Sequence, residues 1–154
     1  MRWAYSYCGV MALALAGCGA DAAGKKLPES VSVTGTVIMN GAPLRNATLW
    51  FVPAEGTKGS GSTGYTDESG EYELTVVHGN EGAVPGKYKV LISKLVLPDG
   101  SEIPPDSTEP PAMLNAHELL PSTYSTIEET VLTAVVPADG GEIDFKFDAD
   151  VIAK

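Results

Sequence analysis

The sequence predicts an all-β fold, a single β-sandwich of about seven short strands, on three observations. Apolar and polar residues alternate with a period of two through much of residues 31–150. Seventeen glycines and eleven prolines form turns and interrupt helices. No segment carries a sustained apolar stripe with the helical period of about 3.6 residues. A domain of this length buries about 65–70% of its unfolded surface, so it can form a core without metals or disulfides.

The first strands are predicted in residues 31–39 and 48–52. Residues 31–39 alternate in hydrophobicity and stop at an Asn-Gly dipeptide, which is typical of tight hairpin turns. Residues 48–52 are apolar on both faces, so we expect Trp50 to be buried in the core rather than to form a sugar-stacking platform. Residues 54–64 contain four glycines, two serines and two threonines, and we expect a flexible loop there.

A turn and two clearly alternating strands follow. Asp67 is expected to accept hydrogen bonds from nearby backbone N–H groups while Gly70 adopts a positive φ, a turn that accounts for these residues better than a calcium site does. One face of residues 71–76 and one face of residues 87–94 should be buried. The inward side chains are those of Tyr72, Leu74, Val76, Tyr88, Val90 and Ile92. Two more strands within residues 131–148 complete the set.

One segment, residues 98–123, departs from this pattern. It holds six prolines, including two Pro-Pro pairs, and only a brief helix-compatible run from Met113 to Leu120. An excursion of this length inside a small domain is uncommon and is often functional. We therefore predict an insertion at one end of the sandwich. A binding surface is expected on it or on loop 54–64, because sandwiches display function on loops that rigid strands hold in place.

The first residues, 1–17, have the features of a signal peptide. Arg2 supplies one positive charge, residues 3–16 are mostly apolar, and the apolar stretch is too short to span a membrane. The run Leu-Ala-Gly-Cys at its end resembles the bacterial lipobox. This resemblance implies signal cleavage between Gly17 and Cys18 and a lipid, with acyl chains such as palmitate, on the Cys18 thiol. Such chains, at about 0.8 kcal/mol per buried CH₂, hold a protein stably on a membrane.

The predicted organisation is a signal peptide at 1–17, the lipidated cysteine and a flexible tether at 18–30, and the sandwich at 31–150. We expect an exported protein whose membrane partner is reached through the lipid on Cys18. Gly19 favours the outer membrane, because aspartate at that place retains lipoproteins in the inner membrane of well-studied envelopes. The formal net charge of −10, which becomes −11 without the signal peptide, argues against nucleic acid as a partner, since an acidic chain repels phosphate.

Short motifs along residues 31–94 resemble one family of extracytoplasmic domains. They are Val33-Thr-Gly-Thr-Val37, Gly41-Ala-Pro-Leu44, Phe51-Val-Pro53, Thr66-Asp67, Gly70-Glu-Tyr-Glu-Leu74 and Gly86-Lys-Tyr-Lys-Val90. These motifs look like the opening of carboxypeptidase regulatory-like domains, which are transthyretin-like, prealbumin-type β-sandwiches. Residues 119–148 are similar to the tail of small secreted lipoproteins of this kind. The resemblance implies a seven-stranded prealbumin-like sandwich that serves as a binding or spacer module.

No catalytic or metal site is predicted. Hydroxyisourate hydrolase, an enzyme built on the transthyretin-like fold, uses a pair of histidines, an arginine and a C-terminal Tyr-Arg-Gly-Ser, whereas this chain ends in Val-Ile-Ala-Lys. Arg45 is the only arginine beyond the signal peptide, and His78 and His117 lie in or beside predicted loops without that motif. Two scattered histidines are also too few for the ligand set of a zinc site. We therefore expect no enzyme activity, no cofactor and no bound metal.

The sequence thus favours a non-catalytic envelope lipoprotein. Its sandwich would bind an unidentified partner, an envelope protein or a glycan, or would serve as a structural element. The alternative is a carbohydrate-binding module at the cell surface. Such a module needs solvent-exposed aromatic side chains, and Tyr65 and Tyr124 are the residues that we expect to be exposed.

Overall fold

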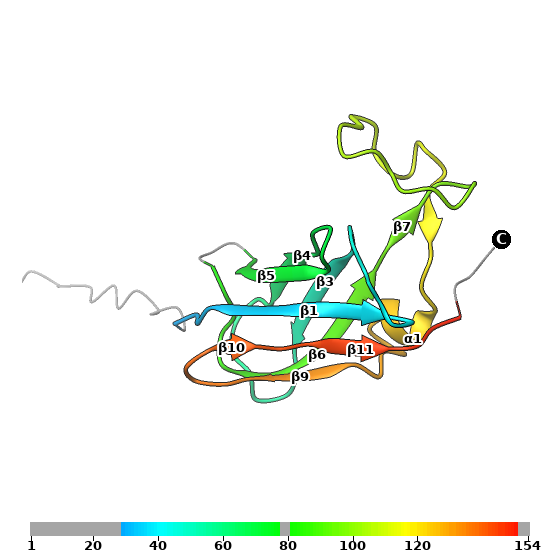
Figure 1. Ribbon diagram of the computed structural model, residues 1–154. Coiled ribbons are helices and arrows are strands. Elements are labelled where there is room, and N and C mark those ends of the chain that lie inside the picture. The colour runs from blue at the N-terminus through cyan, green and yellow to red at the C-terminus, as the bar shows by residue number, and fades with distance from the viewer. Residues whose placement is uncertain (1–28, 78–80, 151–154) are drawn as a thin grey trace, which may run out of the picture.

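The chain folds around a large, mainly antiparallel sheet that curls on itself, which confirms the predicted all-β class. The computed structural model describes residues 29–77 and 81–150 (Figure 1). The signal peptide, Cys18, Gly19, nearly all of the predicted tether and His78 lie outside these residues. The elements in chain order are β1 (Val33–Met39), β2 (Ala42–Pro43), β3 (Thr48–Pro53), β4 (Ser62–Tyr65), β5 (Glu71–Val76), β6 (Gly86–Ser93), β7 (Leu95–Val96), β8 (His117–Glu118), α1 (Ser122–Ser125), β9 (Thr133–Val136), β10 (Gly141–Glu142) and β11 (Phe145–Phe147).

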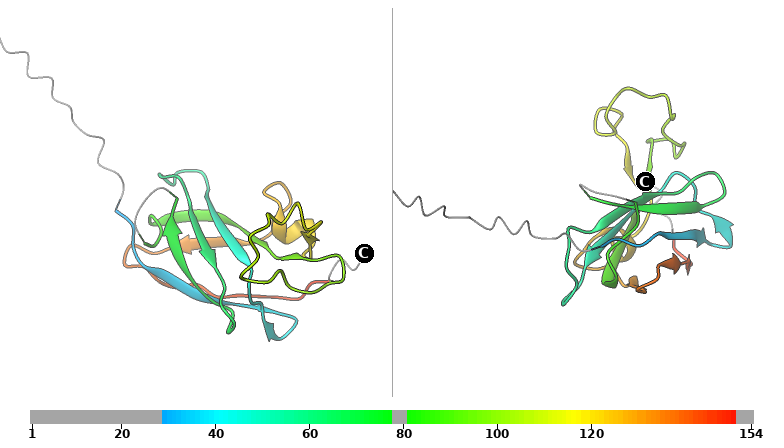
Figure 2. Two further views of the ribbon diagram at one scale, coloured as in Figure 1. Left: turned by 90° about the horizontal axis from the view of Figure 1, so that it is seen from above. Right: turned by 90° about the vertical axis from the view of Figure 1, so that its left-hand side faces the viewer.

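The large sheet has the strand order β10-β1-β5-β4-β3-β6-β9, and β2 and β11 also pair with β1. Its pairs are antiparallel, except that β1 runs parallel to β10 and β11. The two views in Figure 2 show that the curl wraps the sheet around one core, an arrangement consistent with a β-sandwich. The first and last strands of the domain therefore lie side by side.

The alternation of the strands explains which side chains form the core. Five of the six predicted inward side chains are buried, those of Tyr72, Leu74, Tyr88, Val90 and Ile92. The sixth, Val76, is only partly buried at the end of β5. Phe51 of β3 is the centre of an aromatic cluster, with its ring centroid 6.3 Å from Tyr72, 5.7 Å from Tyr88 and 6.0 Å from Phe145. Because these rings come from β3, β5, β6 and β11, the cluster joins distant parts of the curled sheet.

Two predicted turns are confirmed by the backbone. Asn40 and Gly41 have φ angles of 52° and 76°, as a tight hairpin between β1 and β2 requires at its two central residues. The carboxylate of Asp67 accepts hydrogen bonds from the backbone N–H groups two and four residues further on, at 2.9 and 3.0 Å. Gly70 has a φ of 79°. Residues 67–70, which begin with two acidic side chains, therefore form the predicted turn.

Two expectations around β3 are wrong. Trp50 is 37% exposed, because β3 is covered on one face only: Leu49 and Phe51 point into the core and Trp50 points away from it. Loop 54–64 is shorter than predicted, since β4 begins at Ser62, whose side chain is buried. In both places the position of the strand within the sheet overrides the local composition.

The predicted insertion is a ribbon that projects from one end of the sandwich. Figure 1 shows the paired strands β7 and β8 leading away from the sheet into a lobe formed by residues 97–116. The excursion begins at β7 and ends at β8 rather than spanning residues 98–123, because Leu120 is fully buried in the domain core. The helix-compatible run from Met113 to Leu120 is not helical. Part of it pairs with β7 instead, and the short helix α1 follows it.

Candidate functional site

A network of charged and polar groups holds the base of the ribbon against the sheet. The ammonium of Lys94, at the end of β6, donates hydrogen bonds to Glu102 Oε1 and to the carbonyl oxygen of Arg45, both at 2.8 Å. The Glu102 carboxylate also accepts from Arg45 Nε at 3.1 Å and from the amide of Asn46 at 2.7 Å. These four residues are called the latch below. Because Glu102 lies in the lobe and the other three do not, the latch ties the lobe to the domain.

The latch is electrostatically compensated. The side chain of Lys94 is 9% exposed and that of Glu102 is 34% exposed, so the pair is partly removed from solvent. The hydrogen bond from Lys94, followed by that from Asn46, lowers the pKa of Glu102 against the opposing effect of burial. Glu102 is therefore held in its charged form, which is the form that a buried ammonium requires.

A second carboxylate fixes the returning strand of the ribbon. Glu118 of β8 accepts hydrogen bonds from the hydroxyl of Ser93 at 2.5 Å and from the backbone N–H groups of Lys94 and Leu120 at 2.9 and 3.0 Å. With the latch, this carboxylate ties both legs of the ribbon to the end of β6. The base of the lobe is thus fixed by hydrogen bonds on both of its legs.

A groove lies at the foot of the ribbon, with a cavity volume of about 290 Å³. We call it the Trp50 groove. Its walls combine apolar and polar side chains: Trp50, Leu95, Ile103, Asn46, Thr48, Ser93, Lys94 and Glu102. Mixed walls with a few polar groups are typical of small-molecule sites, in which apolar contact supplies affinity and polar groups supply orientation.

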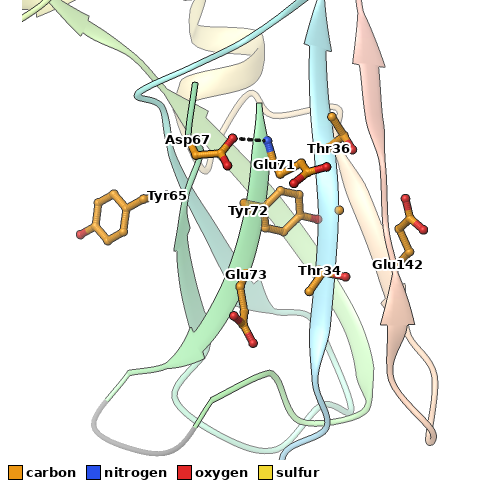
Figure 3. A pocket seen from close by; sticks show the side chains of 9 residues that line it. Thr34, Thr36, Tyr65, Asp67, Glu71, Tyr72, Glu73 and Glu142 are labelled. Carbon is orange, nitrogen blue, oxygen red and sulfur yellow. Dashed lines mark hydrogen bonds between the residues drawn. The ribbon is translucent and has the colours of Figure 1, made fainter. Parts of the chain in front are cut away.

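A larger and more open groove crosses the outer face of β4, β5, β1 and β10, with a volume of about 490 Å³. We call it the acidic groove. Figure 3 shows its carboxylates and hydroxyls arranged around β5 and β1, with Tyr65 standing apart on the β4 side. The residues are Thr34, Gly35, Thr36, Tyr65, Asp67, Glu71, Tyr72, Glu73 and Glu142. Four carboxylates give this groove a negative potential that repels anions.

The floor of the acidic groove depends on a close backbone approach. A Cβ on Gly35 would lie 2.0 Å from the carbonyl oxygen of Ile143, so only glycine fits between β1 and the chain beside it. The hydroxyl of Tyr72 donates to the same carbonyl oxygen at 2.5 Å. Burial, followed by the charge of Asp144, raises the pKa of Tyr72, so its hydroxyl stays protonated and remains a donor.

Each groove is lined by one of two exposed aromatic side chains, the Trp50 groove by Trp50 and the acidic groove by Tyr65. Trp50 lies opposite Thr63 in the β3–β4 ladder and Thr48 lies opposite Tyr65, so Trp50 and Tyr65 are diagonal neighbours on the outer face. Tyr65 is 71% exposed, as the sequence predicts. The exposure of Trp50 was missed, because Leu49, Trp50 and Phe51 are all apolar and no alternation marks which face is covered.

The other residues singled out from the sequence do not form a site together. Tyr124 is not a free platform: its ring stacks on Phe147 at a centroid distance of 4.5 Å, and its hydroxyl donates to the carbonyl oxygen of Asp148. Arg45 belongs to the latch, whereas His117 pairs with Val96 in the ribbon. Among the described residues, no group of three or more His, Cys, Asp or Glu side chains is placed to hold a metal ion. Nor does any helix there have the length and apolar character needed to cross a membrane.

The described residues define an all-β, sandwich-type domain with two outer-face grooves and a projecting ribbon. No protein-family model matches the chain, and no curated protein matches it. A DUF3823 family protein from Parabacteroides merdae ATCC 43184 is similar in structure, with a TM-score of 0.37 and 11% identity over 81% of this chain and 47% of that one. A 9R-lipoxygenase from Cyanothece PCC8801 is similar with a TM-score of 0.34 and 14% identity, over 77% of this chain and 16% of the enzyme. The chain thus spans about half the length of the first protein, and at these scores neither likeness carries a functional argument.

Proposed function

We propose that the protein is an exported, lipid-anchored envelope protein whose sandwich is a non-catalytic binding module of the carboxypeptidase regulatory-like, transthyretin-like kind. The observation that carries the proposal is the ribbon, which the hydrogen bonds of the latch and of Glu118 hold beside the Trp50 groove. Binding residues are commonly displayed on such excursions because a rigid scaffold lowers the entropy lost on binding.

The non-catalytic part of the proposal rests on the composition of the two grooves. Neither groove is lined by a histidine or a cysteine. In the Trp50 groove, Lys94 and Glu102 form an ion pair with each other. In the acidic groove, the exposed carboxylates are suited to binding hydroxyl or cationic groups. These features favour recognition over acid–base or nucleophilic chemistry.

The lipid anchor is supported by the sequence around Cys18. Cys18→Ala should abolish incorporation of labelled palmitate and delay processing, because the thiol is the acceptor of the lipid. Cys8→Ala is the matched control, since Cys8 lies within the proposed signal peptide and should leave labelling intact. Labelling of Cys18→Ala at the level of the unmodified protein would contradict the anchor and, with it, the proposed outer-membrane location.

The binding role is tested by cross-linking the full-length lipidated protein in its own envelope and identifying the captured species by mass spectrometry. One dominant partner should appear. It should be lost when a short Gly-Ser linker replaces residues 103–115, a change that keeps Glu102, Glu118 and the buried Leu120. Recovery of lipid and bulk envelope proteins alone would favour a purely structural role and contradict binding.

A carbohydrate-binding module at the cell surface is a second candidate. It is favoured by the exposure of both Trp50 and Tyr65 on neighbouring strands of one sheet face. Aromatic side chains in this position are suited to stacking on sugar rings.

A further inference from the structure

We infer that the outer face of β3 and β4 binds an uncharged, extended oligosaccharide, which runs from the Trp50 groove across Trp50 and Tyr65 into the acidic groove. This inference rests on the proposed binding function and names its ligand class and its site. It is carried by two exposed aromatic side chains on neighbouring strands, each of which lines one of two grooves on the same sheet face.

The aromatic pair supplies stacking surfaces at a spacing that the strand register sets. Diagonal neighbours on adjacent antiparallel strands lie about 7–8 Å apart between their Cα atoms. Trp50 and Tyr65 hold this relation because their ladder partners are Thr63 and Thr48, respectively. The C–H face of a sugar ring is apolar and carries partial positive charge, so it is attracted to the negative face of an aromatic ring.

The groove ends offer the polar groups that sugar hydroxyls need. The Trp50 groove contains the Thr48 and Ser93 hydroxyls and the Asn46 amide. The Asn46 side chain both donates and accepts hydrogen bonds, and one of its N–H groups is already oriented by Glu102. In the acidic groove, carboxylates from β5 and the Thr34 and Thr36 hydroxyls of β1 accept hydrogen bonds. Hydrogen bonds from these groups to sugar hydroxyls would give specificity in addition to stacking.

Charge decides between uncharged and anionic glycans. The acidic groove carries four carboxylates, and the chain as a whole has a net charge of −10. In the Trp50 groove, Glu102 is already paired with Lys94 and Arg45, so this groove attracts neither cations nor anions strongly. A uronate or sulfate group on the bound oligosaccharide would therefore be repelled by the carboxylates of the acidic groove, and no excess positive charge in the Trp50 groove would compensate.

The same face is poorly suited to an extended peptide. Peptides that bind sheets add a strand to a free edge, where backbone N–H and C=O groups are unpaired. β3 is paired on both sides, by β4 and β6, and β4 is paired by β3 and β5. Only side chains are offered on this face, which favours a ligand recognised by stacking and hydroxyl contacts.

Trp50 itself provides the readout. The chain contains two tryptophans, and the one at position 3 is absent from the lipoprotein after processing before Cys18, so Trp50 is the only tryptophan in the mature protein. The processed, lipidated protein is purified in a non-glycosidic detergent and its mass is checked. It is then titrated with cellohexaose and chitohexaose, and in parallel with polygalacturonate and with an unstructured peptide, while tryptophan fluorescence is followed.

We expect a saturable fluorescence change with at least one of the uncharged hexasaccharides and none with polygalacturonate or the peptide. In calorimetry, Trp50→Ala and Tyr65→Ala should each weaken binding by about tenfold or more, because each removes a stacking surface. Met113→Ala is the matched control: Met113 is 75% exposed but lies on the lobe and lines neither groove, so the affinity should not change. An unchanged melting temperature shows that the variants fold.

Three outcomes would overturn the inference: no binding of either hexasaccharide, binding of polygalacturonate or peptide only, or an affinity in Trp50→Ala and Tyr65→Ala that equals that of the unmodified protein. Envelope cross-linking of the same variants separates this failure from failure of the proposed function. If sugars do not bind but one protein partner is still captured, the binding module stands and its glycan ligand is wrong. If neither is found, both are wrong.

Discussion

At the residue scale, Gly35 on the floor of the acidic groove is required by a backbone approach that leaves no room for a side chain. β1 lies against Ile143 so closely that Tyr72 can reach the same carbonyl oxygen with its hydroxyl. Next to this approach, the carboxylate of Asp144 accepts a hydrogen bond from the backbone N–H of Thr36 at 2.8 Å. This bond joins β1 to the chain between β10 and β11.

Gly35→Ala should therefore lower the free energy of unfolding by about 2–3 kcal/mol, since the added methyl group collides with backbone rather than with a flexible side chain. Urea unfolding measures the change. Gly100→Asn is the control: Gly100 has open space around it and a φ of 82° that asparagine tolerates, so stability should change little. Equal stability of Gly35→Ala and the unmodified protein would show that β1 can move away from Ile143.

At the scale of elements, the ribbon is an insertion whose attachment is largely polar, with Val96 of β7 as its buried apolar residue. Its lobe exposes Met113 and several prolines, and it is joined to the sheet by the β7–β8 pair, the latch and Glu118. An attachment of this kind fixes direction because each hydrogen bond has a required geometry. These hydrogen bonds therefore set the direction in which the ribbon leaves the sheet beside the Trp50 groove.

Glu102→Gln should destabilise the protein more than Lys94→Met does. The first change leaves a nearly buried ammonium without its counter-charge, at a cost of about 1–3 kcal/mol, whereas the second replaces it with an apolar chain of similar length. Glu102 then keeps Arg45 and Asn46 as donors. Urea unfolding gives the order, and Arg45→Met, at an exposed pair, should cost less than about 1 kcal/mol. The reverse order for Glu102→Gln and Lys94→Met would show that the ammonium reaches water.

At the scale of the whole molecule, the domain is closed by pairing its first strand with its last two. β1 forms parallel ladders with β10 and β11, and the bond from Thr36 to Asp144 joins residues 108 positions apart. Phe145 of β11 then covers Phe51 at the centre of the aromatic cluster. Because contacts so distant in sequence carry a large loop-closure entropy, we expect folding to be slow for a domain of this size.

Truncation after Gly140 should abolish cooperative unfolding, because it removes β10, β11 and the aromatic ring that covers Phe51. Replacement of residues 103–115 by a short linker removes a similar length of chain but leaves the curled sheet whole, so its thermal transition should stay sharp. Calorimetry compares the two. A cooperative transition in the truncated chain would mean that β1 needs no partner on that side.

Local patterns in the sequence predicted the strands and turns because their causes are local. Alternation placed Tyr72, Leu74, Tyr88, Val90 and Ile92 in the core, and the Asn-Gly and Asp67–Gly70 turns follow from backbone conformations that few residues adopt. Proline density likewise marked the insertion. The N-terminal lipobox reading is also local, and it remains a prediction that labelling of Cys18 will test.

The candidate site could not be predicted because it depends on what covers each strand. The composition of residues 48–52 fits a strand buried on both faces, yet the curl of the sheet covers one face only and leaves Trp50 beside Tyr65. Tyr124 was expected to be exposed, and the return of β11 brings Phe147 onto it. The latch joins Asn46, Lys94 and Glu102 from three separate segments. Sequence therefore determined the longer strands and their inward faces, whereas tertiary structure added the short strands β2, β7, β8 and β10 and decided which outward side chains meet. The reason is that burial depends on contacts between residues far apart in the chain.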